Sequence, residues 1–178
     1  MILNQQHEVR VARGPLESFL RRVKRELGLS QSDVTICLIS DKAMARLNQD
    51  FRKKKGPTDV LSFPHDNSFS ARRRHRGKQR SKGRKRIGMR HDSEKFSPLI
   101  YPERSRRVTR PSPLYLGDIA ISPATAKRYA KDNGRHLAGE LRVLILHGVL
   151  HLLGYDHETD RGEMDAIEQR LRKRFGLM

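Results

Sequence analysis

The sequence contains little cysteine, no long apolar segment and few acidic residues. Cys37 is the single cysteine, so no intramolecular disulfide can form, which fits a reducing compartment. No segment approaches the roughly 18 consecutive apolar residues of a membrane span. Residues 1–8 lack the basic and then apolar pattern of a signal peptide. We therefore expect a cytoplasmic protein that has no membrane partner.

The shortage of acidic residues leaves a large positive charge. The chain has 38 Lys or Arg against 20 Asp or Glu, a net charge of +18. Residues 66–112 contain 16 basic and 4 acidic residues, so +12 of that charge lies there. Residues 71–86 have almost no apolar content and no Phe, Tyr or Trp, which predicts neither a packed core nor base stacking. We expect residues 66–112 to be disordered, and so basic a chain to bind a polyanion such as RNA.

The two flanks of this segment carry apolar residues at the spacings of strands and helices. We predict one domain, residues 1–178, interrupted by residues 66–112. Its fold class is α+β, with about four strands and about five helices. The expected strands are 8–12, 34–39, 60–63 and 116–121, and the expected helices begin near residues 15, 41, 123, 137 and 161.

Three histidines lie in the segment H-G-V-L-H-L-L-G-Y-D-H, residues 147–157. His147 and His151 are four residues apart in the predicted helix, so they share one face with Cβ atoms about 5–6 Å apart. Gly154 permits a turn out of the helix, which can bring His157 back toward them. Three neutral nitrogen ligands and an open fourth position are typical of a catalytic zinc site. Core histidines would be the alternative, but each would need its own buried partner.

The same spacing occurs in metzincin proteases as H-E-x-x-H-x-x-G-x-x-H. This chain has all three histidines and the glycine, but Gly148 replaces the glutamate that acts as the proteases' general base. Zinc lowers the pKa of water at its fourth position toward about 7, so hydroxide is available with little help from a base. The ligand geometry is therefore expected to be shared, and the peptidase chemistry is not.

Three further residues are candidates for roles beside the metal. Asp156 and Asp118 are the nearest carboxylates that could orient a ligand histidine or the water; Asp156 could equally be a solvated turn residue. Asp118 lies in a predicted strand, where it would share a face with Leu116 and Ala120 and would need a partner. Arg52 opens a basic turn and could bind phosphate through two parallel hydrogen bonds, although a charge run is often only a solvated surface.

Three motifs occur in one order: P-T-D-V-L-S-F-P (57–64), L-G-D-I-A-I-S (116–122) and the histidine segment. Together they resemble the YbeY family of bacterial metallo-endoribonucleases, over nearly the whole chain except the insertion. The resemblance implies a small mixed sheet with the zinc-site helix central. It also implies one zinc ion held by His147, His151 and His157, with Arg52 as the functionally important arginine.

The resemblance further implies a single-strand-selective ribonuclease that matures the 3′ end of small-subunit ribosomal RNA and acts in ribosome quality control. The expected partners are single-stranded RNA, ribosomal RNA and the small ribosomal subunit. Either zinc-bound hydroxide or the neighbouring 2′-OH could attack the phosphodiester. Two alternatives stay open: a metal-dependent hydrolase of another substrate, such as a peptide, and an RNA-binding ribosome-assembly factor with a structural metal.

Overall fold

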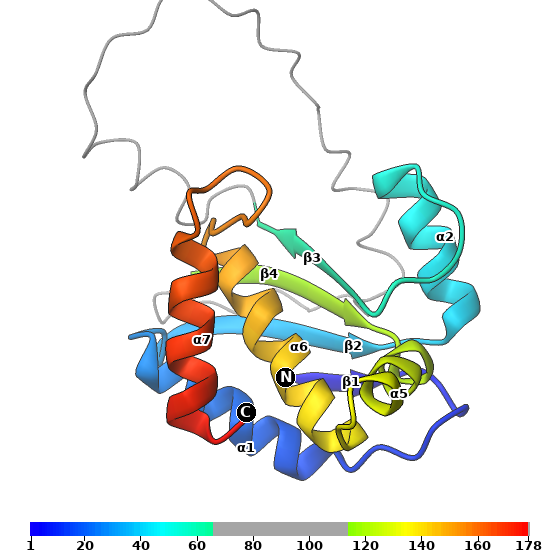
Figure 1. Cartoon of the computed structure of the whole chain (residues 1–178), viewed down its shortest axis with the longest axis horizontal. Helices are drawn as coiled ribbons and strands as arrows, with labels where there is room; N and C mark the ends of the chain where they lie inside the picture. The colour runs from blue at the N-terminus through cyan, green and yellow to red at the C-terminus, as the bar shows by residue number, and fades with distance from the viewer. Residues whose placement is uncertain (66–113, 178) are drawn as a thin grey trace, which may run out of the picture.

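Four strands form one mixed sheet in the computed structural model, which describes residues 1–65 and 114–177 (Figure 1). The spatial order is β1-β2-β4-β3, in which β1, β2 and β4 are parallel and β3 is antiparallel to β4. The predicted insertion, residues 66–112, lies outside the described residues. The strands are β1 (Ile2–Asn4), β2 (Ser32–Leu38), β3 (Val60–Pro64) and β4 (Leu114–Ile121).

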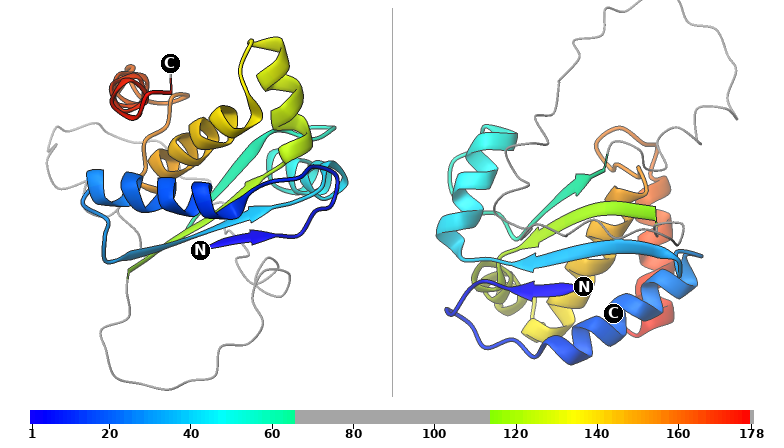
Figure 2. Two further views of the ribbon diagram at one scale, coloured as in Figure 1. Left: turned by 90° about the horizontal axis from the view of Figure 1, so that it is seen from below. Right: turned by 180° about the vertical axis from the view of Figure 1, so that it is seen from behind.

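Five helices of the described part of the chain cover the two faces of this sheet unequally (Figure 2). Helices α1 (Arg13–Glu26), α5 (Pro123–Asp132), α6 (Leu137–Leu152) and α7 (Glu163–Phe175) lie on one face. Helix α2 (Asp41–Arg52) packs on the other face through Met44. The predicted α+β fold is therefore confirmed. The predicted central helix is α6, which contacts α1, α5, α7, β3 and β4.

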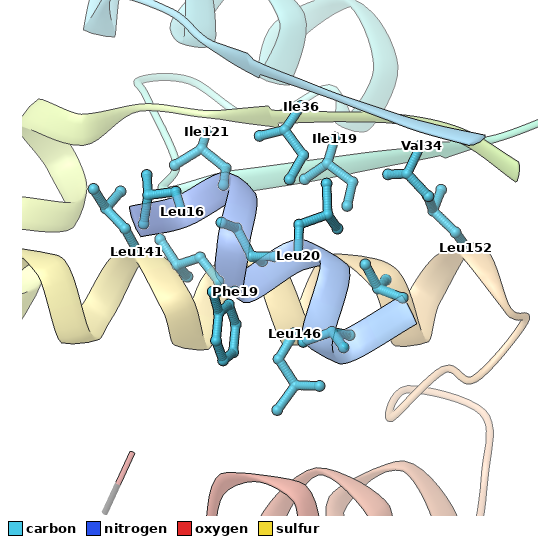
Figure 3. Close-up of a cluster of buried hydrophobic side chains, with 14 of the residues drawn as sticks. Leu16, Phe19, Leu20, Val34, Ile36, Ile119, Ile121, Leu141, Leu146 and Leu152 are labelled. Atoms are coloured by element: carbon cyan, nitrogen blue, oxygen red, sulfur yellow. The ribbon is translucent and has the colours of Figure 1, made fainter. Parts of the chain in front are cut away.

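The main core lies between the sheet and helices α1 and α6 (Figure 3). Alternate residues of β2 point to this side, so Ile36 packs with Ile119 of β4, Leu20 of α1 and Leu146 of α6. Cys37, the next residue of β2 after Ile36, points to the opposite face, where it is buried with Met44 of α2. Burial raises the pKa of the Cys37 thiol to about 12, which fits the structural role that the sequence predicts.

The first predicted strand, residues 8–12, is wrong. The first strand is Ile2–Asn4, which pairs with β2. Buried Gln6 explains the difference: its side-chain nitrogen donates to the Val9 carbonyl at 2.8 Å, and its side-chain oxygen accepts from the Val9 amide at 2.9 Å. The backbone of Val9 therefore bonds to one side chain in place of a neighbouring strand.

Serine residues cap the N-termini of two helices, α2 and α5. Ser40 accepts a hydrogen bond from the amide of Ala43 at 3.2 Å, and Ser122 accepts one from the amide of Thr125 at 3.4 Å. Such bonds satisfy amides that have no partner within the helix. The starts of α2 and α5 could therefore be predicted from the sequence. In the described part of the chain, every helix is too short or too polar to cross a membrane.

Asp41 joins the starts of α2 and α5 and gives a test of this packing. Its carboxylate accepts hydrogen bonds from Ser122, from Thr125 at 2.7 Å and from Arg128 at 2.7 Å. Burial alone would raise the pKa of Asp41, but these hydrogen bonds outweigh it and hold the pKa below its ordinary value. The ionised form therefore stabilises the fold.

We expect Asp41→Asn to lower the free energy of unfolding by about 1 kcal/mol or more at neutral pH. Because the folded-state pKa is depressed, this contribution is present above the unfolded-state pKa of about 3.9 and is lost as the pH falls through the folded-state value. Urea unfolding between pH 7 and pH 3 measures the difference, with exposed Asp50→Asn on the same helix as control. A difference that does not shrink in acid would contradict the prediction.

Candidate metal centre

The structure brings the three predicted histidines together. His147 and His151 lie on one face of α6, and the chain then turns at Gly154, whose φ of +83° favours glycine. That turn returns His157 to the other two. One ring nitrogen from each histidine lies within 4.8 Å of the others, and the Nε2 atoms of His147 and His151 are 3.0 Å apart.

This donor set fits a metal ion. Two nitrogens bound tetrahedrally to zinc at about 2.0–2.1 Å would lie about 3.3 Å apart, close to the observed separation of His147 and His151. Among the described residues, these three histidines are the one group of three or more potential ligands that converges in this way. A structural zinc site is closed by four protein ligands, whereas three leave a position open for chemistry.

His151 has the protonation state that metal binding requires. Burial lowers the pKa of its imidazole, and the neighbouring His147 and His157 lower it further. The ring is therefore neutral at neutral pH, and a neutral imidazole has a lone pair to give to a metal.

A buried carboxylate behind His147 was missed by the sequence analysis. The Nδ1 of His147 lies 3.1 Å from Oε2 of Glu168, which belongs to α7. Arg172 donates to the other carboxylate oxygen, Oε1, from Nε at 3.0 Å and from Nη2 at 2.6 Å. Burial alone would raise the pKa of Glu168, but His147 and Arg172 outweigh it, so the pKa is lowered and the carboxylate is ionised.

The sequence does carry a signal for this carboxylate. Glu168 lies four residues after Met164 and three before Leu171, and all three are buried along one face of α7. A charged residue inside an apolar stripe needs a buried partner. Its place in the stripe could have marked Glu168 as unusual, although it could not have named His147 as the partner.

Gly148 lies against the sheet and cannot be exchanged for the glutamate of the proteases without moving the core. A Cβ atom at Gly148 would lie 2.8 Å from Cδ1 and 2.9 Å from Cγ2 of Ile119, a fully buried residue of β4. The glycine therefore lets α6 approach β4 closely. The position that supplies the base in those proteases faces the core here.

The histidines open onto a cleft of about 820 Å³. It lies between the end of α2, strand β3, helix α6 and the loop that carries His157. Among the described residues that line it, Arg52 and Arg172 are the two cationic ones. Asp59, Glu140, Asp156 and Glu158 also line it. Arg172 is paired with buried Glu168 and Arg52 with exposed Glu158, so Arg52 is the cation that a polyanion could more readily reach.

Arg52 is the last residue of α2, and the turn after it is held in place. Asn48 donates a hydrogen bond from its side chain to the carbonyl of Gly56 at 2.9 Å, and Lys53 adopts a left-handed conformation with φ of 56°. The Nη2 of Arg52 lies 3.0 Å from Oε1 of Glu158, the residue after His157. Arg52 thus reaches from α2 to the loop that carries the third histidine.

Asp156 shapes the histidine loop. Its carboxylate accepts hydrogen bonds from the amide of Glu158 at 3.1 Å and from the hydroxyl of Thr159 at 3.0 Å. The bond from the Glu158 amide is the main reason that the pKa of Asp156 is lowered. Asp156 therefore supports the turn that presents His157.

Asp118 is not brought to the histidines. It pairs with Thr35 of β2 and Phe63 of β3, and its carboxylate accepts a hydrogen bond from the Tyr115 hydroxyl at 2.5 Å. The next residue, Ile119, faces α6. Successive side chains of a strand point to opposite faces, so Asp118 points away from α6 and cannot orient a histidine by contact.

The prediction that Asp118 and Leu116 share a face of β4 is wrong. Asp33 of β2 pairs with Tyr115, but Val34 pairs with Gly117, so β4 has one extra residue at this point. Gly117 has φ of +136° and approaches β3 so closely that a Cβ atom would overlap its backbone. This β-bulge reverses the alternation and turns Leu116 toward the main core.

Comparison with known proteins identifies the family. The model of the family described as Endoribonuclease YbeY matches residues 1–176. Proteins of that name from Solibacter usitatus and Koribacter versatilis are 34% and 33% identical, over 93% and 99% of this chain and 80% and 86% of their own lengths. A solution structure of a Thermotoga maritima protein matches with a TM-score of 0.54 at 21% identity, covering 99% of this chain and 90% of that one, and supports the fold alone. The chain belongs to the Endoribonuclease YbeY family.

Proposed function

We propose that this protein is a zinc-dependent endoribonuclease that cleaves single-stranded RNA in the cytoplasm. We further propose that it matures the 3′ end of small-subunit ribosomal RNA and takes part in ribosome quality control. The observation that carries the proposal is the convergence of three histidine nitrogens at a cleft that Arg52 lines. Membership of a family of endoribonucleases supports the choice of RNA as substrate.

The histidines have the task of holding the metal with one side open to the cleft. His147 and His151 are fixed by α6, and His157 is fixed by the turn that Asp156 supports. When bound there, a zinc ion would supply Lewis acidity and lower the pKa of a water molecule. Zinc is proposed over other divalent metals because a set of three imidazole nitrogens at near-tetrahedral spacing suits it.

Arg52 has the task of binding the scissile phosphate. A guanidinium can donate two parallel hydrogen bonds to phosphate oxygens. As the phosphodiester reacts, negative charge grows on these oxygens, and a fixed cation stabilises the transition state more than the ground state. Arg52 is suited to this because it reaches across to the residue next to His157.

A cleft also favours flexible RNA over a duplex. The reacting phosphate must reach histidines that line a hollow between α2, α6 and the loop after α6. A single strand can bend and unstack to enter such a hollow, whereas paired strands are held in a regular helix. Residues 66–112, with their charge of +12, would add sequence-independent attraction to ribosomal RNA and the small subunit.

The proposal is tested with zinc-loaded protein and two forms of one RNA, free and annealed to its complement. We expect internal cleavage of the free strand and little cleavage of the duplex. Product ends show the chemistry, since a 2′,3′-cyclic phosphate requires attack by the 2′-OH. Binding without cleavage would favour the assembly-factor alternative. Cleavage of a peptide library but not of RNA would favour a hydrolase of another substrate.

Glu158 gives a prediction about access of RNA to Arg52. Its carboxylate is paired with Arg52 at 3.0 Å, and the two side chains are 61% and 41% exposed. Such exposed pairs contribute only about 0–1 kcal/mol to stability, so Glu158→Gln should leave the melting temperature nearly unchanged. It removes a competitor for Arg52 and a negative charge beside the phosphate.

We therefore expect Glu158→Gln to lower the KM for single-stranded RNA by about 2–5-fold, with the effect fading at high salt. Steady-state cleavage at low and high potassium chloride measures it. Asp132→Asn is the control, because Asp132 is exposed on α5 and does not line the cleft. An unchanged or higher KM would show that Glu158 does not compete with RNA.

A further inference from the structure

Glu168 makes contacts to two functional neighbours with its two carboxylate oxygens. It is 6% exposed and lies on the buried face of α7. Oε2 lies 3.1 Å from Nδ1 of His147, and Oε1 accepts from Nε of Arg172 at 3.0 Å and from its Nη2 at 2.6 Å. These contacts join Arg172, Glu168 and His147 in a series, called the relay below. The relay ends at one of the three candidate metal ligands.

Packing alone does not account for a carboxylate at this position. The neighbours on the same face, Met164 and Leu171, are apolar and almost fully buried. Removing a charge from water is costly, and an apolar residue of similar size often stabilises a core at least as well. What an apolar residue could not do is accept a hydrogen bond from His147.

The hydrogen bond has a defined direction. Glu168 is ion-paired with Arg172 through Oε1, so its other carboxylate oxygen, Oε2, is an acceptor and the Nδ1 of His147 is the donor. The lone pair of His147 then lies on Nε2, the atom that faces Nε2 of His151 at 3.0 Å. A carboxylate behind a ligand histidine fixes its tautomer and ring orientation and makes the imidazole a stronger donor to a metal.

We propose that Glu168 is a positioning residue for the metal ligand His147, and that Arg172 in turn holds Glu168 in place. Helix α7 thereby becomes part of the metal centre, although it contributes no ligand. This inference rests on the proposed role of the three histidines as metal ligands. It does not depend on RNA being the substrate.

Arg172 suits its part of this relay. Two of its N–H groups converge on one oxygen of Glu168, which leaves the other oxygen to His147. Charge-assisted bonds of this kind restrict the carboxylate more than a single neutral bond would. Since Arg172 also lines the cleft, the relay runs from the cleft surface to the back of the histidine.

Glu140 provides a matched control. It is also a glutamate that is 6% exposed, it lies on α6 and lines the same cleft, and it is ion-paired with Arg135 at 3.1 Å. The side chain that pairs with it is an arginine and not a histidine. Glu140→Gln therefore reproduces the loss of a buried glutamate–arginine pair without touching the proposed relay.

The experiment measures zinc affinity by competition with a chromophoric chelator, together with the melting temperature of the metal-free protein. We expect Glu168→Ala to weaken zinc binding by about 10–100-fold. Glu168→Gln should weaken it less, because the amide oxygen still accepts from Nδ1, and Glu140→Gln should stay within about twofold of the parent. Arg172→Gln should fall between Glu168→Gln and the control.

Nuclear magnetic resonance of ¹⁵N-labelled histidine supplies a readout that a purely structural role would not move. In the metal-free parent, His147 should be protonated at Nδ1, and in Glu168→Ala it should become a mixture of tautomers. If Glu168→Ala does not fold, Glu168→Gln and Arg172→Gln decide by the same two measurements.

The inference is overturned if the Glu168 variants bind zinc as tightly as Glu140→Gln, or if the tautomer of His147 does not change. Failure of the proposed function has a different signature. A parent protein that binds zinc through this relay but leaves RNA intact would contradict the nuclease assignment and retain the relay. Weak zinc binding by the parent itself would contradict the metal centre as a whole.

Discussion

His151→Ala is expected to lose zinc-dependent RNA cleavage by a factor of about 1,000 or more, while the metal-free protein still folds. Loss of one of three ligands would leave two nitrogens, too few to hold the ion and its open position. A bound metal supplies several kcal/mol of transition-state stabilisation, and each 1.36 kcal/mol corresponds to a factor of ten in rate. His151 is the best test because the hydrogen bonds of Glu168 go to His147 and Arg172 and not to His151, so the relay from α7 is left intact.

The measurement pairs cleavage of a single-stranded RNA with thermal unfolding in zinc and in chelator. A ligand present at 100 times its dissociation constant stabilises the folded state by about 2.7 kcal/mol. The parent should therefore melt at a higher temperature in zinc than in chelator, and His151→Ala should show no such shift. His136→Ala is the control, since His136 is exposed at the start of α6 and does not belong to the triad.

The two assays separate the possible errors. A variant that loses activity but keeps the zinc shift would show that His151 acts on RNA and does not bind metal. A variant that keeps both RNA cleavage and the zinc shift would contradict the three-histidine metal centre. If zinc stabilises the parent and the control equally but neither cleaves RNA, the metal site stands and the substrate has been misassigned.

The histidine triad could be predicted from the sequence because its geometry is local. Two ligands are four residues apart on one helix, and the third follows a glycine turn, so helix and turn rules suffice to bring them together. The order of apolar segments likewise predicts most of the fold. The start of α6 at Leu137, for example, agrees with the predicted start near residue 137.

Glu168 could not be assigned to the site because its contact is tertiary. His147 and Glu168 are 21 residues apart, on helices whose relative placement depends on how both pack on the sheet. Sequence spacing says which face of α7 is buried but not which residue lies opposite. The same limit applies to Arg172, which is brought to the cleft only by that packing.

Local irregularities account for the other errors. Strict alternation along β4 predicts that Asp118 and Leu116 share a face. The bulge at Gly117, which lies between them, turns Leu116 to the opposite face. The strand predicted at residues 8–12 was displaced by one buried side chain, that of Gln6. Both are single-residue effects, and each overrides a pattern that depends on several residues.

Arg52→Ala is expected to lower kcat/KM for single-stranded RNA by about 100-fold or more, since losing one fixed donor to a developing negative charge costs about 10²–10³ in rate. Zinc affinity should stay within about twofold, because Arg52 contacts Glu158 and no histidine in the described part of the chain. The melting temperature should change little, since the pair with Glu158 is exposed. Arg52→Lys should recover only part of the activity, because an ammonium lacks the planar fork of a guanidinium.

The control for charge alone is Lys55→Ala, an exposed cation of the turn that follows Arg52. Its loss should raise KM modestly and reduce the dependence of binding on salt, as loss of one phosphate contact does. Arg52→Ala should differ by acting on kcat.

The double variant Arg52→Ala, Glu158→Gln tests whether Glu158 acts by occupying Arg52. If it does, the lower KM of Glu158→Gln should disappear once Arg52 is absent. If the lower KM persists in the double variant, Glu158 repels RNA directly. Normal cleavage by Arg52→Ala would show that Arg52 has no role in the reaction.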